Sequence, residues 1–150
     1  EGKALNNVSE VIDLATLAIS AEAVGIMQKM NELTLDYTKT REQFGQALSK
    51  FQALQHRMVD TFMVHEQTKS LLLMAAAKMN DKAADTSKSI SALKYQIGSA
   101  AKLIGEESIQ LHGGMGVTEE MSIGHYFKRL TTIRTIFGNS DYHLKRYSSL

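Results

Sequence analysis

Apolar side chains recur three and four residues apart in four long stretches of this chain, the spacing that lines one face of an α-helix. The stretches cover about residues 8–40, 49–79, 86–111 and 120–136. A tail to Leu150 has room for a last short helix. Asn7 or Ser9 is the expected N-cap of the first helix, and Asp85 that of the third. The buried face expected for the second helix consists of Phe51, Leu54, Met58, Phe62, Leu72 and Ala76.

The segments between these stretches predict how the helices are connected. Residues 42–46 break the pattern at Gly45 and indicate a loop, residues 80–85 are short and polar, and Gly113 and Gly114 end the third stretch. Glycine tolerates a positive φ, so the first of these two glycines can end a helix. Short connections make neighbouring helices antiparallel, so the predicted fold is all-α, an up-down-up-down four-helix bundle. The first two helices are longer than such a bundle needs, which indicates packing against another domain or subunit.

Composition supports helices and excludes several classes of protein. The 150 residues include no proline and no cysteine, so helices can run without interruption and neither a disulfide nor a thiolate site can form. Seventeen basic and sixteen acidic residues give a net charge of +1, which is too balanced for a nucleic-acid-binding surface. No run reaches the ~20 apolar residues of a membrane span, and the first five residues lack the apolar segment of a signal peptide. We therefore expect one domain that resides in the cytoplasm or in an organellar matrix.

Metal and hydrolase chemistry find little support in the sequence. A di-iron bundle needs Glu and His three residues apart on its helices. His65 and Glu66 are adjacent and should face different directions, and neither Glu106 nor Glu107 has a His three residues later. A Gly-x-Ser-x-Gly sequence does not occur. We therefore expect no metal site, five histidines mostly at surface or capping positions, and eight methionines mainly as core filler.

Three polar segments between the helices carry the remaining candidate chemistry. Residues 41–45 offer a cation, an amide and an aromatic ring, residues 110–116 an amide and bare backbone, and residues 138–141 hydroxyl and amide groups. A cation together with loop N–H groups suits a phosphate, and a ring beside amides suits an adenine. The alternative is that these segments are ordinary polar turns between helices.

The sequence of these segments resembles the acyl-CoA dehydrogenase family. Residues 37–52 are similar to the pattern Tyr…Arg-x-Gln-Phe-Gly-x-x-Leu…Gln of that family, and residues 110–117 to its Gln-x-x-Gly-Gly-x-Gly loop. Residues 128–141 resemble its closing arginine-rich helix and turn, and residues 23–25 fit the first helix of the same domain. The motifs follow one another at matching spacing, so residues 1–150 resemble the C-terminal helical domain of the family. Its N-terminal helical domain and middle β domain have no counterpart in these residues.

The resemblance implies that the domain helps to bind FAD, which in this family lies between domains and across a subunit interface. Arg41 would pair with the pyrophosphate of a neighbouring subunit's FAD, and Phe44 and Gln52 would lie near the adenine half. Asn139 and Asp141 would stand beside the subunit's own FAD. The complete set of implied cofactor-binding residues is Arg41, Gln43, Phe44, Gln52, Gln110, Gly113, Gly114, Asn139 and Asp141.

The catalytic base of the family has no counterpart at either of its usual positions. Dehydrogenation requires a group that removes the α-proton of the acyl-CoA while a hydride leaves the β-carbon for the flavin. The position of the usual glutamate is Phe137, and the alternative position on the first helix is Ala15. Two explanations remain: Asp141 or Glu22 acts as the base from a shifted position, or the chain is the base-free subunit of a hetero-oligomer.

Further resemblances favour the second explanation and define the competing functions. The Ser-Ala-Glu-Ala-Val-Gly run at 20–25 and the Gly-x-x-Asp-x-His ending at 138–143 are similar to members with unequal subunits, including the small subunits of pimeloyl-CoA-type dehydrogenases. The implied function is a component of an acyl-CoA dehydrogenase, inactive alone, that forms homo- or hetero-oligomers through the bundle. One alternative is a non-catalytic helical oligomerisation scaffold, which would bind no flavin. Another is a related flavin enzyme, such as acyl-CoA oxidase or nitroalkane oxidase, which would release hydrogen peroxide.

Overall fold

A computed structural model describes the backbone of residues 3–150 and their side chains except those at positions 3, 5 and 6. Its elements are α1 (Lys3–Thr40), β1 (Glu42–Gln43), β2 (Gln46–Ala47), η1 (Leu48–Lys50), α2 (Gln52–Asn80), α3 (Thr86–His112), η2 (Gly113–Val117), α4 (Ser122–Ile133) and α5 (Ser140–Ser149). The predicted helices are confirmed, including the short one in the tail. The N-cap expected for the first helix is wrong, because the helix begins at Lys3 and Asn7 and Ser9 lie inside it.

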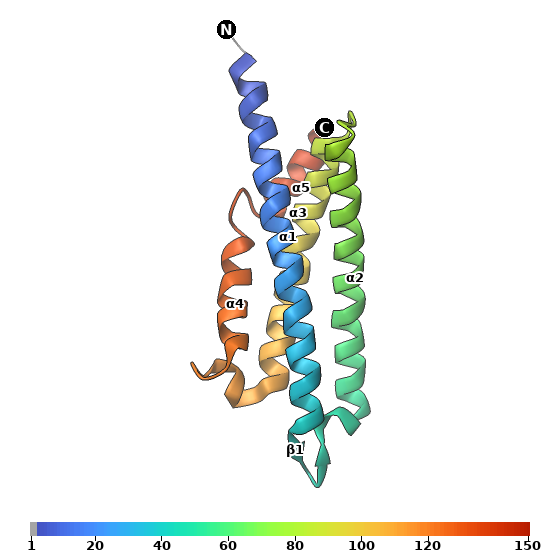
Figure 1. The fold of residues 1–150 in the computed structure, drawn as a ribbon, viewed down its shortest axis with the longest axis vertical. Coiled ribbons are helices and arrows are strands. Elements are labelled where there is room, and N and C mark those ends of the chain that lie inside the picture. Colours follow the sequence, from blue (N-terminus) through green and yellow to red (C-terminus); the bar gives the residue numbers. More distant parts are fainter. Residues whose placement is uncertain (1–2) are drawn as a thin grey trace.

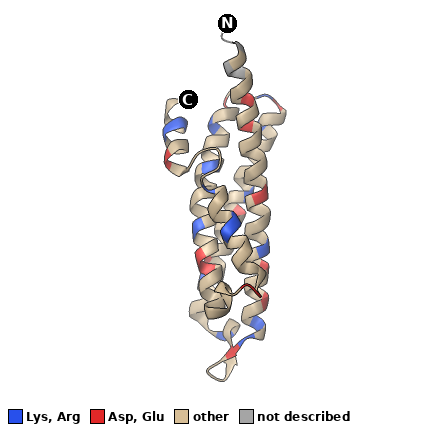
Figure 2. Ribbon diagram, turned by 90° about the vertical axis from the view of Figure 1, so that its left-hand side faces the viewer, with Lys and Arg blue, Asp and Glu red and all other residues tan. Residues whose placement is uncertain are grey.

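Helix α3 is the centre of the bundle (Figure 1). It packs against α1, α2, α4 and α5, whereas α2 and α4 lie on opposite sides of the α1–α3 pair. The predicted up-down-up-down four-helix bundle is therefore confirmed, with α5 added beside the first half of α3. Acidic and basic residues are interspersed along the helices in the view of Figure 2.

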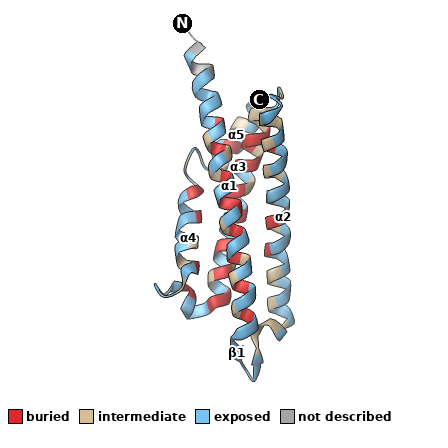
Figure 3. Cartoon of the chain, viewed as in Figure 1, coloured by how far each residue is buried: buried red, intermediate tan, exposed pale blue. Residues whose placement is uncertain are grey.

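The apolar core lies mainly between α1, α3 and α4 (Figure 3). Its buried members are Ala23, Val24, Met27, Met30, Ala75, Ile90, Leu93, Ile97, Ala100, Ala101, Ile104, Ile123, Leu130 and Ile133. A fully buried Leu or Ile side chain stabilises the fold by about 1.5–3 kcal/mol, and α3 supplies the most of them. Met27 and Met30 occupy the core as expected, whereas Met63, Met74 and Met115 are exposed, so the expectation is wrong for those three.

Helix α2 presents a mostly polar stripe to the interior. The buried face predicted for this helix is wrong at Phe62, whereas its other members are partly buried: Phe51, Leu54, Met58, Leu72 and Ala76. Its buried residues are Thr61, His65, Thr68 and Ala75, whereas Phe62 is 58% exposed. Threonine can be buried here because its hydroxyl donates to a carbonyl of the preceding turn. Thr61 donates to the Met58 carbonyl at 2.9 Å and Thr68 to the Val64 carbonyl at 2.7 Å. Large apolar side chains of α2 lie on both sides: Val64, Leu71, Leu72 and Met79 pack partly buried against the core, and Val59, Phe62, Met63, Leu73 and Met74 are exposed.

The connections between helices agree with the prediction in position and differ in detail. The predicted loop at 42–46 is a hairpin in which β1 pairs antiparallel with β2. Phe44 and Gly45 form its turn with φ of 56° and 80°, the positive pair that a tight two-residue hairpin requires. Asp85 occupies the N-cap position of α3 but makes no capping bond, because its carboxylate pairs with Lys78.

The histidines depart most from expectation. His65, His112 and His143 are buried, so the prediction of surface or capping positions holds only for the exposed His56 and His125. Each buried ring bonds a nearby oxygen, which lowers the cost of burying it. His65 Nδ1 lies 3.0 Å from the Glu66 carboxylate, although we expected these adjacent residues to face apart. Within residues 3–150 no cluster of three or more potential metal ligands occurs, and no helix is long and apolar enough to cross a membrane.

Candidate functional site

One end of the bundle carries a cavity of ≈ 560 Å³, which we call the loop-end cavity; the hairpin and the end of α1, which contribute to its lining, lie at the lower end of Figure 1. It is lined by Tyr37, Arg41, Gln43, Leu48, Leu54, Arg57, Gln110, Leu111, His112, Gly113, Gly114, Met115 and Thr118. The end of α1, the hairpin, the start of α2 and the end of α3 meet here. The structure therefore brings together five of the predicted cofactor-binding residues, namely Arg41, Gln43, Gln110, Gly113 and Gly114.

The glycines of this end shape the loop that leaves α3. Gly113 has φ 59° and ψ −141° and donates its backbone N–H to the Gln110 carbonyl, so it ends the helix as predicted. At Gly116 a side chain is excluded, because a Cβ would lie 2.8 Å from the Ile109 carbonyl oxygen. At Gly113 and Gly114 a Cβ would meet nothing within 4 Å. The backbone of these two residues is therefore uncovered and accessible to a ligand.

Two aromatic residues that the sequence reasoning missed form part of the cavity wall. Tyr37 and His112 stack with ring centroids 4.3 Å apart, and the Tyr37 hydroxyl donates to the His112 carbonyl at 3.3 Å. Burial lowers the pKa of His112, although the Ser108 carbonyl 2.8 Å from Nδ1 opposes this. The ring is neutral at neutral pH, with Nδ1 donating to that carbonyl. Its buried Nε2 is then an acceptor without a partner in the described part of the chain.

The two arginines of the cavity differ in what they bind. Arg57 is half-buried and its Nε lies 2.5 Å from the Glu107 carboxylate. Arg41 is exposed at the end of α1, and among residues 3–150 it forms no ion pair. Its positive charge is therefore available to an anion, whereas that of Arg57 is compensated within the chain. The resemblance had singled out Arg41, and nothing in the sequence pattern distinguished Arg57.

Phe44 and Gln52 lie near the cavity without lining it. Phe44 is 91% exposed at the hairpin tip and packs edge-on against Phe51, with ring centroids 6.2 Å apart. Gln52 is the exposed first residue of α2. The Gln43 amide donates to the Glu42 carbonyl at 2.8 Å, so part of its hydrogen-bonding capacity is used locally. Phe44 and Gln52 therefore lie outside the lining of the loop-end cavity, although each is close in sequence to a residue that lines it.

Asn139 and Asp141 lie at the other end of the bundle from the loop-end cavity. Asn139 precedes α5, and Asp141 is the second residue of that helix (Figure 1). The Asn139 side chain accepts a hydrogen bond from the Tyr142 backbone N–H at 3.0 Å and caps α5. Asp141 is exposed in the first turn of α5. The structure therefore does not bring these two residues together with Arg41, and Asn139 has a structural role that the sequence pattern did not reveal.

Among the four positions considered for a catalytic base, few have a carboxylate that is free to accept a proton. Phe137 is 43% exposed in the turn before α5, and Ala15 is half-buried on α1. Glu22 accepts two hydrogen bonds from Arg129, at 2.5 and 2.8 Å, which lower its pKa. A carboxylate held in an ion pair is a weaker proton acceptor. Of the two shifted candidates, only Asp141 keeps an exposed carboxylate that no arginine or lysine of residues 3–150 pairs with.

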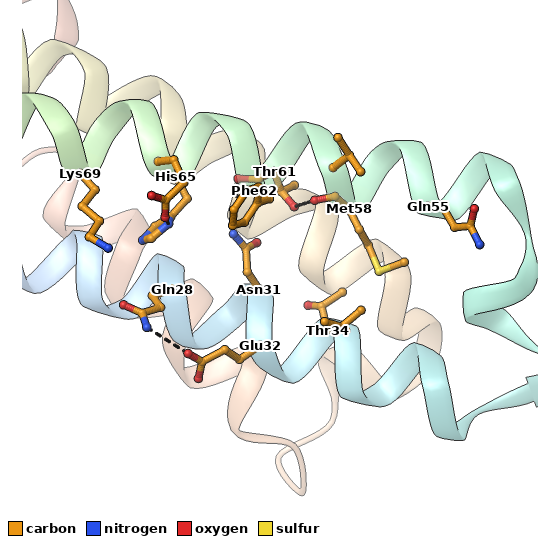
Figure 4. Close-up of a pocket in the computed structure, with 13 residues that line it drawn as sticks. Gln28, Asn31, Glu32, Thr34, Gln55, Met58, Thr61, Phe62, His65 and Lys69 are labelled. Carbon is orange, nitrogen blue, oxygen red and sulfur yellow. Dashed lines mark hydrogen bonds and ion pairs between the residues drawn. The ribbon is translucent and has the colours of Figure 1, made fainter.

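A second hollow of ≈ 530 Å³, the α1–α2 groove, runs between these two helices (Figure 4). It is lined by Gln28, Asn31, Glu32, Thr34, Leu35, Gln55, Met58, Val59, Thr61, Phe62, His65, Glu66 and Lys69. Asn31 reaches from α1 toward α2, and its amide donates to the Thr61 carbonyl at 3.3 Å. Leu35, Val59 and Phe62 are all exposed. Exposed apolar side chains of both helices therefore line this groove among polar ones.

Comparisons with a family model, with curated proteins and with solved structures all match this chain to acyl-CoA dehydrogenases. Residues 5–148 match the model of the acyl-CoA dehydrogenase C-terminal domain. The chain is 34% identical over 135 residues to acyl-CoA dehydrogenase IpdE2 of Mycolicibacterium smegmatis, covering 89% of this chain and 41% of that protein. A variant of the Tcur3481-Tcur3483 steroid ACAD superimposes with a TM-score of 0.87 and 30% identity over 91% of this chain and 38% of that one. Butyryl-CoA dehydrogenase of Megasphaera elsdenii gives 0.94 and 25% over 99% of this chain and 39% of that one. The chain therefore spans about two fifths of the length of these proteins.

Proposed function

The chain belongs to the acyl-CoA dehydrogenase family, and from this premise we propose that it is the FAD-binding and oligomerisation domain of an FAD-dependent acyl-CoA dehydrogenase. The proposed reaction is the α,β-dehydrogenation of an acyl-CoA thioester, an oxidation at a CH–CH bond. The observation that carries the proposal is the loop-end cavity. It combines an unpaired exposed cation, within the described residues, with uncovered backbone from a segment distant in sequence.

The donors and acceptors of the loop-end cavity fit the pyrophosphate and adenosine part of FAD. The planar guanidinium of Arg41 can bond two phosphate oxygens at once, and the backbone of Gly113 and Gly114 allows close approach. The buried Nε2 of His112 is an acceptor in the wall of the same cavity, which suits a hydroxyl or amino group of an adenosine. These residues would hold and orient the dinucleotide. FAD, when bound, supplies the hydride acceptor.

The experiment that tests this proposal measures bound FAD in the full-length protein that carries this chain. We expect Arg41→Ala to release FAD during purification, because the pyrophosphate loses its bidentate partner. Lys39→Ala is the matched control, since Lys39 is also basic and exposed in the last turn of α1, and it should retain stoichiometric flavin. Full flavin content in Arg41→Ala would refute the pyrophosphate assignment. If the unaltered protein binds no FAD, the alternative of a helical scaffold is favoured.

We further propose that the subunit lacks its own base and acts in a hetero-oligomer. Phe137 and Ala15 cannot accept a proton, and Glu22 is tied to Arg129. The solved steroid ACAD named for the pair Tcur3481-Tcur3483, to which this chain is 30% identical, is consistent with a partner that supplies the missing carboxylate. Asp141 is the remaining internal candidate.

Anaerobic titration with a series of acyl-CoA thioesters separates a subunit with its own base from one that borrows it. Bleaching of the flavin absorbance in the unaltered protein, lost in Asp141→Asn, would show that the base is internal. Bleaching that requires a second subunit would support the hetero-oligomer. Phe137→Glu in the protein without a partner restores a carboxylate at the family's usual position, so we expect bleaching to appear. Hydrogen peroxide release in air would instead identify an oxidase.

The apolar outer surface of α2 supports association of this domain with another subunit. Val59, Phe62 and Met63 are 53%, 58% and 49% exposed, next to the α1–α2 groove. Contiguous exposed apolar side chains of this kind mark interaction surfaces in soluble proteins. We expect Phe62→Asp to lower the mass measured by light scattering, whereas Gln67→Asp, at an exposed polar position on the same helix, should leave it unchanged. A monomeric mass for the unaltered protein would count against this surface.

A further inference from the structure

The turn that joins α4 to α5, residues 134–139 and here called the α4–α5 turn, is held from inside the molecule by two buried basic side chains. Lys94, 1% exposed on α3, donates from Nζ to the carbonyls of Ile133, Gly138 and Arg134 at 3.0, 2.9 and 3.4 Å. His143 of α5, also 1% exposed, has Nε2 3.0 Å from the Phe137 carbonyl. Together the two residues contact four carbonyls in or beside one short segment.

The Lys94 ammonium matches what the end of α4 lacks. The last carbonyls of a helix have no N–H partner within the helix and carry a partial negative charge. An ammonium has three protons, and here three carbonyl oxygens receive them. Asp13 of α1, a carboxylate whose charge acts on His143, is occupied by Arg146 of α5 at 2.7 and 3.0 Å and by the Ser87 hydroxyl at 2.6 Å, and no salt bridge joins Lys94 to a carboxylate among residues 3–150. The Lys94 charge is therefore compensated by carbonyl dipoles at the end of α4.

The surroundings of His143 fix which of its nitrogens is protonated. Burial lowers the pKa of His143, and the charges of Lys94 and Arg146 lower it further, while the Phe137 carbonyl and Asp13 oppose the shift. The ring is therefore neutral at neutral pH. Because Nε2 faces a carbonyl oxygen, Nε2 carries the proton and donates it. Nδ1 is buried and has no partner in the described part of the chain.

The backbone of the turn needs such support. Phe137 has φ 58° and Gly138 has φ 106°, and a bulky residue rarely adopts the left-handed region. Conformations of this kind persist where the surrounding structure over-determines them. Here the carbonyl of Phe137 is bonded by His143, and the carbonyls of Arg134 and Gly138, on either side of it, are bonded by Lys94.

We propose that Lys94 and His143 are positioning residues that fix the α4–α5 turn, and with it the side chain at position 137, relative to the reacting end of the subunit's own FAD, beside which the family resemblance puts Asn139 and Asp141. The hydrogen bonds from Lys94 and His143 to the carbonyls of residues 133, 134, 137 and 138 hold the turn in place. Only its orientation toward the flavin rests on the proposed function. Lys94 lies outside the segments that resemble the family motifs, whereas His143 ends the Gly-x-x-Asp-x-His run at 138–143, and neither residue lines the loop-end cavity.

Hydrogen exchange on the full-length protein tests the holding of the turn without requiring flavin. The probes are the amides of Thr135 and Gly138, which donate to the carbonyls of Thr132 and Thr135. In Lys94→Met we expect these amides to exchange at least ~10-fold faster, while amides in the middle of α1 keep their rates. Lys102→Met, at an exposed position of the same helix, should change neither. Unchanged exchange at the turn, or an equal increase throughout the molecule, would overturn the proposal.

Substitution of His143 gives an independent variant with a conservative rescue. His143→Leu removes the donor to the Phe137 carbonyl and should accelerate the same amides, whereas His143→Gln retains an N–H donor and should restore part of the protection. If neither Lys94→Met nor His143→Leu folds, the exchange rates of the turn amides in the unaltered protein test the proposal. Turn amides that exchange as fast as in an unstructured peptide would overturn the proposal, and protection comparable to that of the core helices would support it.

The flavin spectrum separates this proposal from the proposed function. In Lys94→Met we expect FAD content to stay the same, because the loop-end cavity is at the other end of the bundle, while the spectral change caused by a bound acyl-CoA is altered. A general loss of stability would reduce FAD content and spectral response together. Faster exchange at the turn with an unchanged spectral response would support the role of Lys94 and His143 in holding the turn. The same result would reject the placement of the turn beside the flavin.

Discussion

The two ends of the bundle treat their polar groups differently. At the loop-end cavity, Arg41 is exposed, the backbone at Gly113 and Gly114 is uncovered, and His112 Nε2 has no partner within the described residues. At the other end, the basic side chains of Lys94 and Arg146 bond to carbonyl, carboxylate and hydroxyl oxygens of the chain itself.

The difference indicates what each end does. Exposed groups such as the Arg41 guanidinium cost little while they are in contact with water, and they can bind a ligand when it arrives. Donors satisfied inside the chain hold a turn or a helix in place, because moving it would leave buried polar groups unpaired. Substitutions of Arg41 or Gly114 should therefore have little effect on stability while altering FAD binding under the proposed function, and substitutions at the α5 end should alter stability first.

The largest effect on stability is expected for Arg146→Met. Asp13 is 3% exposed and is bound by two nitrogens of Arg146, so the substitution leaves a buried carboxylate without its partner. Loss of one member of a buried ion pair costs about 3–5 kcal/mol, and we expect about 3 kcal/mol because part of Arg146 reaches solvent. Urea unfolding of the full-length protein measures this. Lys145→Met, one residue earlier and exposed, should change the free energy of unfolding by less than about 0.5 kcal/mol.

A smaller effect, dependent on pH, is expected from Lys94. Burial lowers its pKa from 10.5 to about 8, so between these values the unfolded chain binds more protons than the folded one and stability rises with pH. Relative to Lys94→Met, the free energy of unfolding should increase by about 2 kcal/mol from pH 7 to pH 9.5. The comparison of the two proteins cancels the titration of the other groups. A difference that is constant with pH would show that the Lys94 pKa is close to its ordinary value.

The sequence was sufficient to predict the bundle but not all of its inner faces. Helical periodicity located α1, α3 and α4 because their apolar residues also form the core. In α2 the same periodicity led to an error at Phe62, which is exposed in this domain. An apolar stripe does not distinguish a side chain that faces the domain's own core from one that faces another subunit. Thr61 and Thr68 are buried because their hydroxyls bond within the helix, and no hydrophobic pattern reveals that.

The candidate site was predictable where glycines and a motif in a loop mark it in the sequence. Gly113 and Gly114, with Arg41 and Gln110, stand out in sequence and meet in the loop-end cavity. The stacking of Tyr37 on His112 and the reach of Lys94 to the end of α4 join residues far apart in the chain. Such contacts depend on how the helices pack against one another, which local periodicity and loop motifs do not determine.

The glycines of the loop-end cavity offer a finer test of the comparison between the two ends. Gly113 has φ 59° and ψ −141°, a combination that only glycine adopts readily. Although a Cβ would find open space there, we expect Gly113→Ala to lower the free energy of unfolding by about 1–3 kcal/mol through backbone strain. Thermal unfolding with and without added FAD measures it. An unchanged unfolding temperature would mean that the loop relaxes into another conformation.

The smallest effect on stability, and the clearest on function, is expected at the neighbouring Gly114. Its φ lies outside the positive region and a Cβ would meet nothing within 4 Å, so Gly114→Ala should alter the free energy of unfolding by no more than about 0.5 kcal/mol. The added methyl group would nevertheless stand where we propose that the dinucleotide approaches the backbone. We therefore expect weaker FAD binding, measured by flavin fluorescence during titration of the apoprotein. Because fold and stability stay the same, lost affinity in this variant reports on the ligand alone, and unchanged affinity would mean that FAD does not approach the chain at this loop.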